Sequence, residues 1–166
     1  NNVSGVKKFS FTNNDKNYLP STGHYYEYIP ANRITWEDAR DDAEKLNYYG
    51  LQGYLATITS LEEARLSGEQ APGQGWIGGS DAEKEGTWKW VTGPEAGKSF
   101  WIGGINGTTN GTDINPPFEY WSGGEPNDWP NPGIQGEENY LHVYDNGYWN
   151  DYPNSNSSIT GYIVEY

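Results

Sequence analysis

The sequence predicts an α+β fold in which two helices precede a set of short antiparallel strands and long loops. Helical periodicity begins at Thr35 and ends about two turns after Ser60. Beyond that point, short apolar segments alternate with turn residues, and the 22 Gly and 10 Pro show no period. Aromatic residues make up 16% of the 166 residues, so a few large side chains can bury much area. We therefore expect one loop-rich domain with an aromatic core.

The first part of the chain carries the helical signals. Residues 1–22 are polar and rich in Asn, and they predict an N-terminal extension with one candidate strand at Val6–Thr12, ahead of a domain at residues 23–166. His24–Pro30 has strand propensity. Thr35 predicts a helix start, because it is a good N-cap and acids follow it in the first turn. The apolar face of this helix consists of Trp36, Ala39, Ala43 and Leu46.

The remaining elements are shorter. Gly53–Ile58 predicts a buried strand, and Ser60-Leu61-Glu62-Glu63 is a capping box that starts the second helix. Asp145-Asn146-Gly147 is a strong hairpin signal. The strands expected after the second helix are Gly75–Gly78, Thr87–Val91, Phe100–Ile102, Tyr120–Trp121, Tyr140–Tyr144, Tyr148–Tyr152 and Gly161–Tyr166. The tryptophans expected in the core are Trp36, Trp76, Trp88, Trp90, Trp121 and Trp149.

The composition excludes several classes of function. Lys and Arg number 10 against 23 Asp and Glu, and the net charge of −13 repels nucleic acid and anionic membranes. No apolar run is long enough to insert into a membrane. The absence of Cys excludes disulfides; it is typical of a reducing compartment, or of a secreted chain that bound metal makes rigid. The chain opens without Met and ends in an apolar stretch, so we expect it to be part of a larger polypeptide.

Three polar segments carry the candidate chemistry: Gly124–Asp128, Glu137–Asn139 and Trp149–Asp151. Each mixes carboxylates with side-chain amides, and Ca²⁺ accepts both within its shell of about six to eight oxygens. Three charged and two neutral ligands would come from Glu125, Asn127, Glu138, Asn150 and Asp151. This set leaves coordination positions open for a second ligand. Zinc is disfavoured, because the segments contain no His or Cys.

The loop of residues 122–137 decides whether these segments meet. It is rich in Gly, Pro and acids, and loops of that length in a compact domain are usually functional or disordered. A count of residues along the predicted hairpin leaves Glu138 well away from Asn150. The loop must therefore fold back over the hairpin if a single site is to form.

Several motifs occur together in a recognisable order. They are Trp36-x-x-Ala39-x-x-x-Ala43, Gly75-Trp76-Ile77-Gly78, Glu125-Pro126-Asn127, Trp149-Asn150-Asp151 and the closing strand Gly161–Glu165. In order and spacing they resemble the motifs of C-type lectin-like domains, over roughly residues 24–166. The resemblance implies a fold in which two helices pack on short sheets, with a long calcium-binding loop region.

The resemblance also implies a role for each polar residue. The principal site, where the family binds calcium and sugar together, corresponds to Glu125, Asn127, Glu138, Asn150 and Asp151. The accessory calcium site corresponds to Asp81, Glu85 and Asp128, with Glu138 shared and Asn139 where an acid is common. Glu-Pro-Asn is the version associated with mannose-, glucose- and fucose-like ligands, and it implies a cis Glu125–Pro126 bond. Two vicinal hydroxyls would bind calcium, donate to Glu125 and Glu138, and accept from Asn127 and Asn150.

The setting implied by the resemblance is a calcium-dependent, non-catalytic glycan-binding module outside the cell or at its surface, as in a bacterial adhesin. The chain departs from the family at three places that bear on this expectation. Ala43, Tyr140 and Val164 fill the positions of the family's cysteines, so calcium is expected to carry more of the loop's stability. Trp129 extends the binding loop and either stacks on a sugar or packs within the loop. Residues 100–117 are longer than usual and can add a partner surface.

Other interpretations of the same residues stay open. The polar residues can be ordinary turn residues, and Asp81 and Glu85 can be solvated acids. The same fold can bind protein, peptide or ice in a calcium-dependent way, because a fold does not determine function. A glycosidase that uses Glu137 and Glu138 as its acid pair is disfavoured, because adjacent residues on a strand point to opposite faces.

Overall fold

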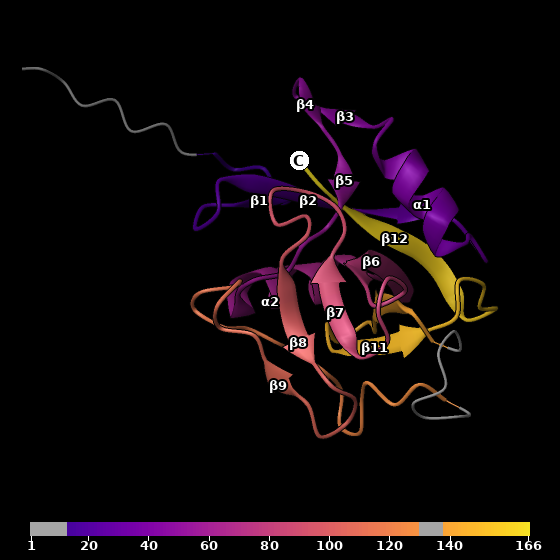
Figure 1. Cartoon of the computed structure of the whole chain (residues 1–166). Coiled ribbons are helices and arrows are strands. Elements are labelled where there is room, and N and C mark those ends of the chain that lie inside the picture. The colour runs from indigo at the N-terminus through magenta and orange to yellow at the C-terminus, as the bar shows by residue number, and fades with distance from the viewer. Residues whose placement is uncertain (1–12, 130–137) are drawn as a thin grey trace, which may run out of the picture.

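The computed structural model describes residues 13–129 and 138–166 (Figure 1). The candidate strand at Val6–Thr12, residue Glu137 and the 130–137 part of the binding loop lie outside the described residues. The described part has the predicted α+β composition. Its helices are α1 (Trp36–Ala43) and α2 (Leu61–Gln70), and its strands are β1 (Tyr18–Leu19), β2 (His24–Pro30), β3 (Asn47–Tyr48), β4 (Leu51–Gln52), β5 (Tyr54–Leu55), β6 (Gln74–Ser80), β7 (Thr87–Trp90), β8 (Ser99–Ile102), β9 (Thr108–Thr109), β10 (Tyr140–Val143), β11 (Trp149–Tyr152) and β12 (Ile159–Glu165).

Both helices begin where the sequence predicts. The Thr35 side chain caps α1 by accepting a hydrogen bond from the Asp38 N–H at 3.1 Å. Ser60 Oγ accepts from the Glu63 N–H at 3.3 Å and donates to Glu63 Oε2 at 2.8 Å, which is the predicted capping box of α2. Leu46, expected on the apolar face of the first helix, lies beyond its end but packs against the same core.

The strands form one large sheet in the order β1-β2-β12-β6-β7-β8-β9, with β10 beside β6 and β11 beside β10. Strand β2, near the start of the domain, pairs antiparallel with the C-terminal strand β12. This pairing places the two ends of the domain side by side. In Figure 1, β12 (yellow) passes next to α1. Strands β12 and β6 run parallel, which departs from the expectation of antiparallel pairing.

The predicted C-terminal hairpin is confirmed. Strands β10 and β11 pair from Tyr140↔Tyr152 to Val143↔Trp149 around the Asp145-Asn146-Gly147 turn. Strand β10 also pairs with β6, so the hairpin is part of the sheet and its turn does not have to hold it alone. Strand β10 is thus hydrogen-bonded on both sides, which fixes the register of the hairpin. Two candidate ligands, Asn150 and Asp151, lie in β11.

Two predicted strands are shorter than expected. Of Gly53–Ile58 only Tyr54–Leu55 forms a strand, and Tyr120–Trp121 forms only a single bridge, between Trp121 and Trp149. In both places the backbone makes isolated hydrogen bonds to neighbouring strands and no continuing ladder. The hairpin of β3 and β4 and the short strand β9 were not predicted.

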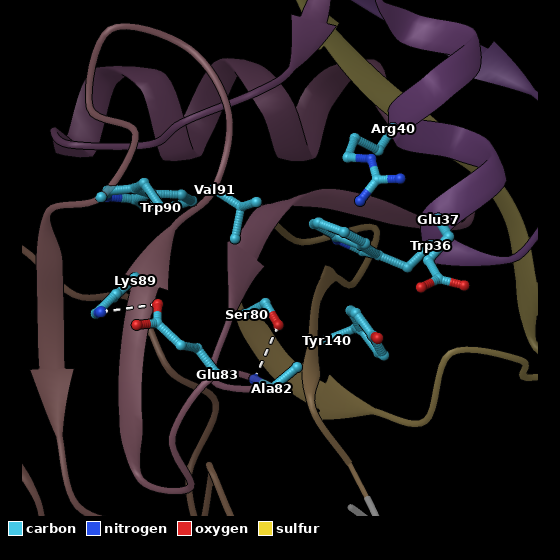
Figure 2. A pocket seen from close by; sticks show the side chains of 11 residues that line it. Trp36, Glu37, Arg40, Ser80, Ala82, Glu83, Lys89, Trp90, Val91 and Tyr140 are labelled. Atoms are coloured by element: carbon cyan, nitrogen blue, oxygen red, sulfur yellow. Dashed lines mark hydrogen bonds and ion pairs between the residues drawn. The ribbon is translucent and has the colours of Figure 1, made fainter.

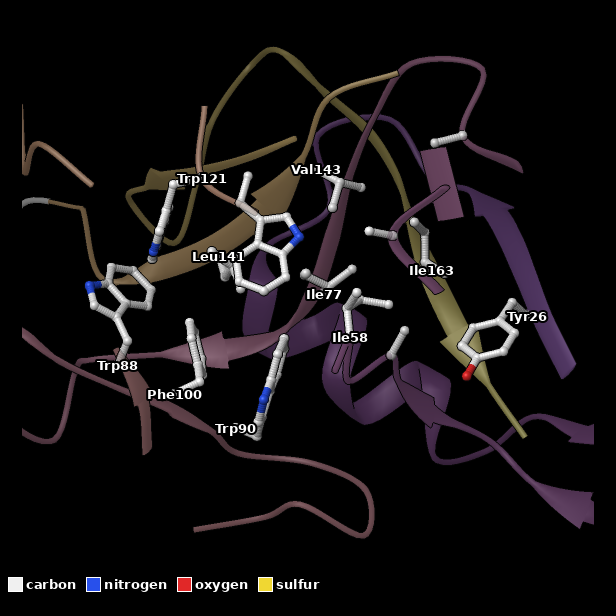
Figure 3. Packing of buried hydrophobic residues seen from close by; sticks show 14 of the residues in the cluster. Tyr26, Ile58, Ile77, Trp88, Trp90, Phe100, Trp121, Leu141, Val143 and Ile163 are labelled. Carbon is white, nitrogen blue, oxygen red and sulfur yellow. The ribbon is translucent and has the colours of Figure 1, made fainter. Parts of the chain in front are cut away.

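The core is aromatic, as predicted. Five tryptophans are at most 2% exposed and the sixth, Trp121, is 8% exposed; the five are Trp36, Trp76, Trp88, Trp90 and Trp149. Figure 3 shows Phe100 between Trp88 and Trp90, and the rings of Trp90 and Phe100 stack with their centroids 4.5 Å apart. Trp149 opens β11, so this packed core supports the strand that carries Asn150 and Asp151.

Apolar packing connects α1 to β12 at two positions where the resemblance implies cysteines. Ala43 and Val164 are both fully buried and belong to the same apolar cluster. The cluster therefore supplies a contact that a disulfide could otherwise provide. Among the residues that the structure describes, none of the helices is both long and apolar enough to span a bilayer.

Candidate metal site

The structure brings the predicted polar residues together around the ends of three neighbouring strands. Asp81 directly follows β6, Asn139 directly precedes β10, and Asp151 lies in β11. Because β10 pairs with both β6 and β11, these three positions are neighbours across the sheet. The loop that contains Glu125, Asn127 and Asp128 then packs onto them through the hydrogen bonds described next.

Asp151 ties this loop to the sheet. Its side chain is 1% exposed, and both carboxylate oxygens accept backbone hydrogen bonds. The Asn127 N–H donates to Oδ1 at 3.2 Å, and the Asp128 N–H donates to Oδ2 at 2.8 Å. The Glu125–Pro126 bond that precedes these residues is cis, as the resemblance implies. Asp151 thus positions the backbone of the Glu-Pro-Asn turn, in addition to its expected role as a ligand.

Asp128 and Glu138 hold each other across the loop. The Glu138 N–H donates to Asp128 Oδ1 at 3.0 Å, and the Trp129 N–H donates to Glu138 Oε2 at 2.8 Å. Asp128 adopts a φ of 48°, in the left-handed region, which an Asp tolerates better than most residues. Glu138 is bonded to Asp128, and Asp128 is bonded to Asp151, so a chain of hydrogen bonds connects Glu138 to β11. The described part of the loop, up to Trp129, therefore folds back over the hairpin, as a single site requires.

A second group of bonds positions Asp81. The Asp81 N–H donates to the Asn139 carbonyl at 3.2 Å, and Asp81 Oδ2 accepts from the Gly86 N–H at 2.9 Å. Ser80 Oγ donates to the same Asn139 carbonyl at 2.7 Å. Sequence reasoning missed Ser80 as a positioning residue; its place directly before an acid at a strand end was the available signal. These bonds join Asp81 and Asn139, two of the proposed accessory ligands.

The decisive feature is a set of buried oxygens without hydrogen-bond partners. Seven of the nine predicted ligands have such an oxygen: Asp81 Oδ1, Glu85 Oε2, Glu125 Oε2, Asn127 Oδ1, Asp128 Oδ2, Asn139 Oδ1 and Asn150 Oδ1. Buried polar atoms normally have partners, and each that lacks one costs about 1–3 kcal/mol, more when it is charged. All seven atoms are acceptors, so cations are suitable partners for them. Carboxylate and amide oxygens in this mixture fit Ca²⁺.

Burial and mutual repulsion raise the pKa of several carboxyl groups in this region. The pKa of Asp81, Glu125 and Glu138 is raised to about 7 in each case, mainly by burial and further by neighbouring carboxylates. Burial likewise raises the pKa of Glu85 and of Asp151, although backbone hydrogen bonds lower the pKa of Asp151 in part. A bound cation would reverse these shifts, because it favours the ionised form of its ligands.

The carboxylates are spread and do not form a tight acidic cluster. Among residues 13–129 and 138–166, no three His, Cys, Asp or Glu side chains converge closely enough to hold a metal ion by themselves. Like charges repel, and the predicted set also contains the amides of Asn127, Asn139 and Asn150. This mixed arrangement argues against zinc and for a cation that binds neutral oxygens with flexible geometry.

The acidic region borders a cavity of about 320 Å³, and a second hollow of about 360 Å³ lies beside α1. Figure 2 shows the second hollow, with Trp36, Arg40 and Tyr140 on one side and Lys89 and Glu83 on the other. Its charged groups already have partners. Lys89 Nζ lies 2.9 Å from Glu83 Oε2, and Arg40 pairs with Asp41. This hollow therefore offers no unpaired charged group to a ligand, unlike the cavity at the acids.

Trp129 lies at the outer side of the site. It is 68% exposed, although its own N–H is bonded to Glu138. Packing within the described part of the loop therefore does not bury its ring. An exposed indole beside a polar site is suited to stacking on a ligand, and that role stays a prediction.

Comparison with known proteins adds independent findings. No protein-family model matches the chain. Halomucin of Haloquadratum walsbyi is 40% identical over 161 residues, which are 96% of this chain and 2% of Halomucin. Asialoglycoprotein receptor 1 of Rattus norvegicus is 33% identical over 99 residues, which are 59% of this chain and 28% of the receptor. The chain thus spans only a small part of the length of these relatives.

Among solved structures, the human scavenger receptor C-type lectin carbohydrate-recognition domain superposes with a TM-score of 0.62. Its identity is 22%, over 90% of this chain and 95% of that chain. The chain has the C-type lectin-like fold. A calcium-independent type II antifreeze protein also superposes, with a TM-score of 0.55 and 22% identity over 86% of this chain and 85% of that chain. The C-type lectin-like fold alone therefore does not determine the ligand.

Proposed function

We propose that this C-type lectin-like domain binds glycans in a calcium-dependent manner, without catalysis, by holding two adjacent sugar hydroxyls. The observation that carries the proposal is the set of seven buried acceptor oxygens without partners. A calcium-independent binder has no reason to bury them, because each is costly to desolvate. Similarity to lectins, a non-enzymatic family, supports a binding function.

The residues of the site would have three roles: binding the cation, donating hydrogen bonds to the sugar, and positioning the turn. Calcium, when bound, would supply open coordination positions for two hydroxyl oxygens. Glu125 and Glu138 would hold the cation and accept the hydroxyl protons, since carboxylates have several acceptor positions each. Asn127 and Asn150 have Oδ1 atoms that are buried and unpartnered, which leaves their NH₂ groups to donate to the hydroxyl oxygens. Asp151 holds the turn through its two backbone hydrogen bonds.

Selectivity follows from the asymmetry of this set. In the Glu-Pro-Asn turn, Glu125 accepts and Asn127 donates, so the pair imposes an order on two neighbouring hydroxyls. Mannose and glucose present equatorial 3- and 4-hydroxyls, and fucose presents a comparable pair. Galactose has an axial 4-hydroxyl and cannot present the same geometry. We therefore expect glycans with mannose, glucose or fucose as ligands.

A glycan array in calcium and in chelator tests the proposal. We expect binding to mannose-, glucose- or fucose-containing glycans in calcium, loss of binding in chelator, and poor competition by free galactose. Calcium-dependent melting without any glycan signal would favour the alternative, a protein, peptide or ice binder. Retained glycan binding in chelator would refute the calcium-dependent mechanism.

The double variant Glu125→Gln/Asn127→Asp tests the selecting residues directly. It keeps the total charge of the site but reverses the donor and acceptor order. We expect weaker mannose binding with calcium binding retained. Asp145→Asn is a suitable control, because Asp145 is exposed in the hairpin turn. Strong galactose preference in the unmodified protein would contradict the assignment and shift the selecting role to Trp129 and the 128–137 loop.

The setting that fits this function is the outside of a cell or its surface, where calcium is abundant. The chain covers small parts of long relatives, which supports a role as one binding module of a larger adhesin. Its net charge of −13 is consistent with such an environment and disfavours nucleic acid as a partner.

A further inference from the structure

We propose that Asn110 is a site of spontaneous covalent modification, at which the side-chain amide is lost and the residue becomes a mixture of aspartate and isoaspartate. Asn110 directly follows β9. In this reaction the backbone nitrogen of the next residue attacks the side-chain amide carbon. A following Gly favours it, because Gly has no side chain to hinder the attack. The sequence contains three such pairs: Asn106-Gly107, Asn110-Gly111 and Asn146-Gly147.

The three pairs differ in whether the attacking nitrogen is already hydrogen-bonded. The Gly107 N–H donates to the Gly104 carbonyl at 2.8 Å, and the Gly147 N–H donates to the Tyr144 carbonyl at 2.9 Å. Each of these bonds must break before the nitrogen can react. Gly111 is exposed, and in the part of the chain that the structure describes its N–H has no hydrogen-bond acceptor. The Gly111 nitrogen can therefore lose its proton to solvent and attack without opening a bonded turn.

Asn110 is also activated at its side-chain carbonyl. Its Oδ1 accepts two hydrogen bonds from Thr112, one from the Oγ1 hydroxyl at 2.6 Å and one from the backbone N–H at 3.2 Å. Attack on the carbonyl carbon places negative charge on this oxygen, and donors that already point at the oxygen stabilise that charge. Asn146 Oδ1 accepts a similar backbone bond from the Tyr148 N–H at 3.1 Å, but its neighbouring Gly N–H is bonded. Asn110 thus combines an open nucleophile with a polarised carbonyl.

The steps balance with water as the co-reactant. The Gly111 nitrogen loses its proton to solvent and forms a bond to Asn110 Cγ. The Cγ–Nδ2 bond then breaks, Nδ2 takes up a proton and leaves as ammonia, and a succinimide ring remains. Water adds to one of the two ring carbonyl carbons and opens the ring. Opening at Cγ gives aspartate, whereas opening at the backbone carbonyl carbon gives isoaspartate, in which the main chain runs through Cγ.

The modification changes the residue that anchors the turn after β9. The Asn110 N–H donates to the Phe100 carbonyl at 3.0 Å, and the Asn110 carbonyl accepts from the Ile114 N–H at 3.3 Å. Ile114 is buried in the aromatic core cluster. Isoaspartate adds a carbon atom to the main chain between these two bonds. Aspartate instead places a second carboxylate at the Thr112 hydroxyl, which lies 3.3 Å from Asp113 Oδ1. Both products therefore weaken the attachment of this turn to the core.

Peptide mapping by mass spectrometry, after incubation of the native protein at mildly alkaline pH, tests the proposal. Each conversion adds one dalton, and chromatography separates isoaspartate peptides from aspartate peptides. We expect Asn110 to convert about tenfold faster than Asn106 or Asn146, a ratio equivalent to one or two hydrogen bonds. In concentrated urea the three rates should converge, because the pairs then differ only in their neighbours along the chain. Equal rates in the native protein, or faster conversion at Asn106 or Asn146, would overturn the proposal.

Two variants separate the nucleophile from the carbonyl. Thr112→Val removes the hydroxyl donor and should slow the conversion of Asn110 about fivefold, the equivalent of one hydrogen bond. Gly111→Ala should slow it at least as much by hindering the attack, and the added Cβ would lie an ordinary 3.6 Å from Pro117 Cβ. Thr109→Val, on the other side of Asn110, is the matched control and should leave the rate unchanged. Unchanged rates in both Thr112→Val and Gly111→Ala would refute the assignment.

The melting temperature of the converted protein gives an independent readout. The converted fraction, separated by ion exchange, should melt at a lower temperature than the intact protein. An equal melting temperature would contradict the predicted weakening of the turn.

Discussion

Asp81→Asn should stabilise the protein in chelator and lose much of that advantage in calcium. Asp81 is 2% exposed, and its Oδ2 accepts a hydrogen bond from the Gly86 N–H that an Asn side chain can also accept. Its Oδ1 is buried without a partner. The substitution therefore removes a buried negative charge while keeping the shape and one hydrogen bond. In chelator that charge is a cost, and in calcium it is a ligand.

The magnitude follows from the pKa of Asp81, which burial and neighbouring carboxylates raise from 3.8 to about 7. At 1.36 kcal/mol per pH unit, this difference corresponds to about 4 kcal/mol. The folded chelated protein binds the proton more tightly than the unfolded chain, so stability falls as pH rises from about 4 to about 7. Above pH 7 both states are ionised and the full cost is present. At pH 8 in chelator, Asp81→Asn should therefore be more stable, by up to roughly 10 °C in melting temperature.

Thermal melting at pH 5 and pH 8, in calcium and in chelator, measures this effect. In chelator the variant and the unmodified protein should converge towards pH 5, where Asp81 is protonated. In calcium the advantage of the variant should shrink, because saturating ligand at 100 times Kd stabilises the unmodified protein by about 2.7 kcal/mol and the variant loses part of this gain. Asp145→Asn, at an exposed position in a turn, should leave all four curves unchanged. An Asp81→Asn variant that is less stable in both calcium and chelator would refute the reasoning and assign Asp81 a purely structural role.

Three further changes test other parts of the structure. Trp129→Ala should lower sugar affinity by about 1 kcal/mol if the exposed ring stacks on the ligand, as measured by titration calorimetry; unchanged affinity would exclude stacking. Acidification below about pH 7 should weaken calcium and sugar binding together, because protons compete for Glu125 and Glu138, whose pKa is raised to about 7 without the cation; sugar affinity that is constant down to about pH 4 would contradict a carboxylate site. Gly78→Ala should lower the free energy of unfolding in urea by about 1–3 kcal/mol, because a Cβ there would lie 2.8 Å from the Leu55 carbonyl oxygen and would also clash with Thr92 Oγ1; an unchanged denaturation midpoint would show that the sheet can shift locally.

The sequence alone was sufficient for features that depend on neighbouring residues. The Thr35 cap, the capping box at Ser60 and the Asp145-Asn146-Gly147 hairpin are all present in the structure, because each depends on hydrogen bonds within a few residues. The buried tryptophans were also predictable, because large apolar rings are usually buried and this chain has few other large apolar side chains to form a core. The candidate ligands were recognisable as a type, because only oxygens were available in the polar segments.

The tertiary structure decided how those ligands are arranged. Asp151 reaches the backbone of Asn127 and Asp128 only because the loop folds back over the hairpin, a contact that a count of residues along the strands does not contain. The raised pKa of Asp81 and the cavity at the acids likewise arise from segments that are distant in sequence. Burial and repulsion depend on everything that surrounds a group in space, whereas caps and turns depend on a few residues along the chain. For this reason the sequence predicted which residues could hold calcium, and only the folded chain showed that seven of the nine have a buried oxygen without a partner.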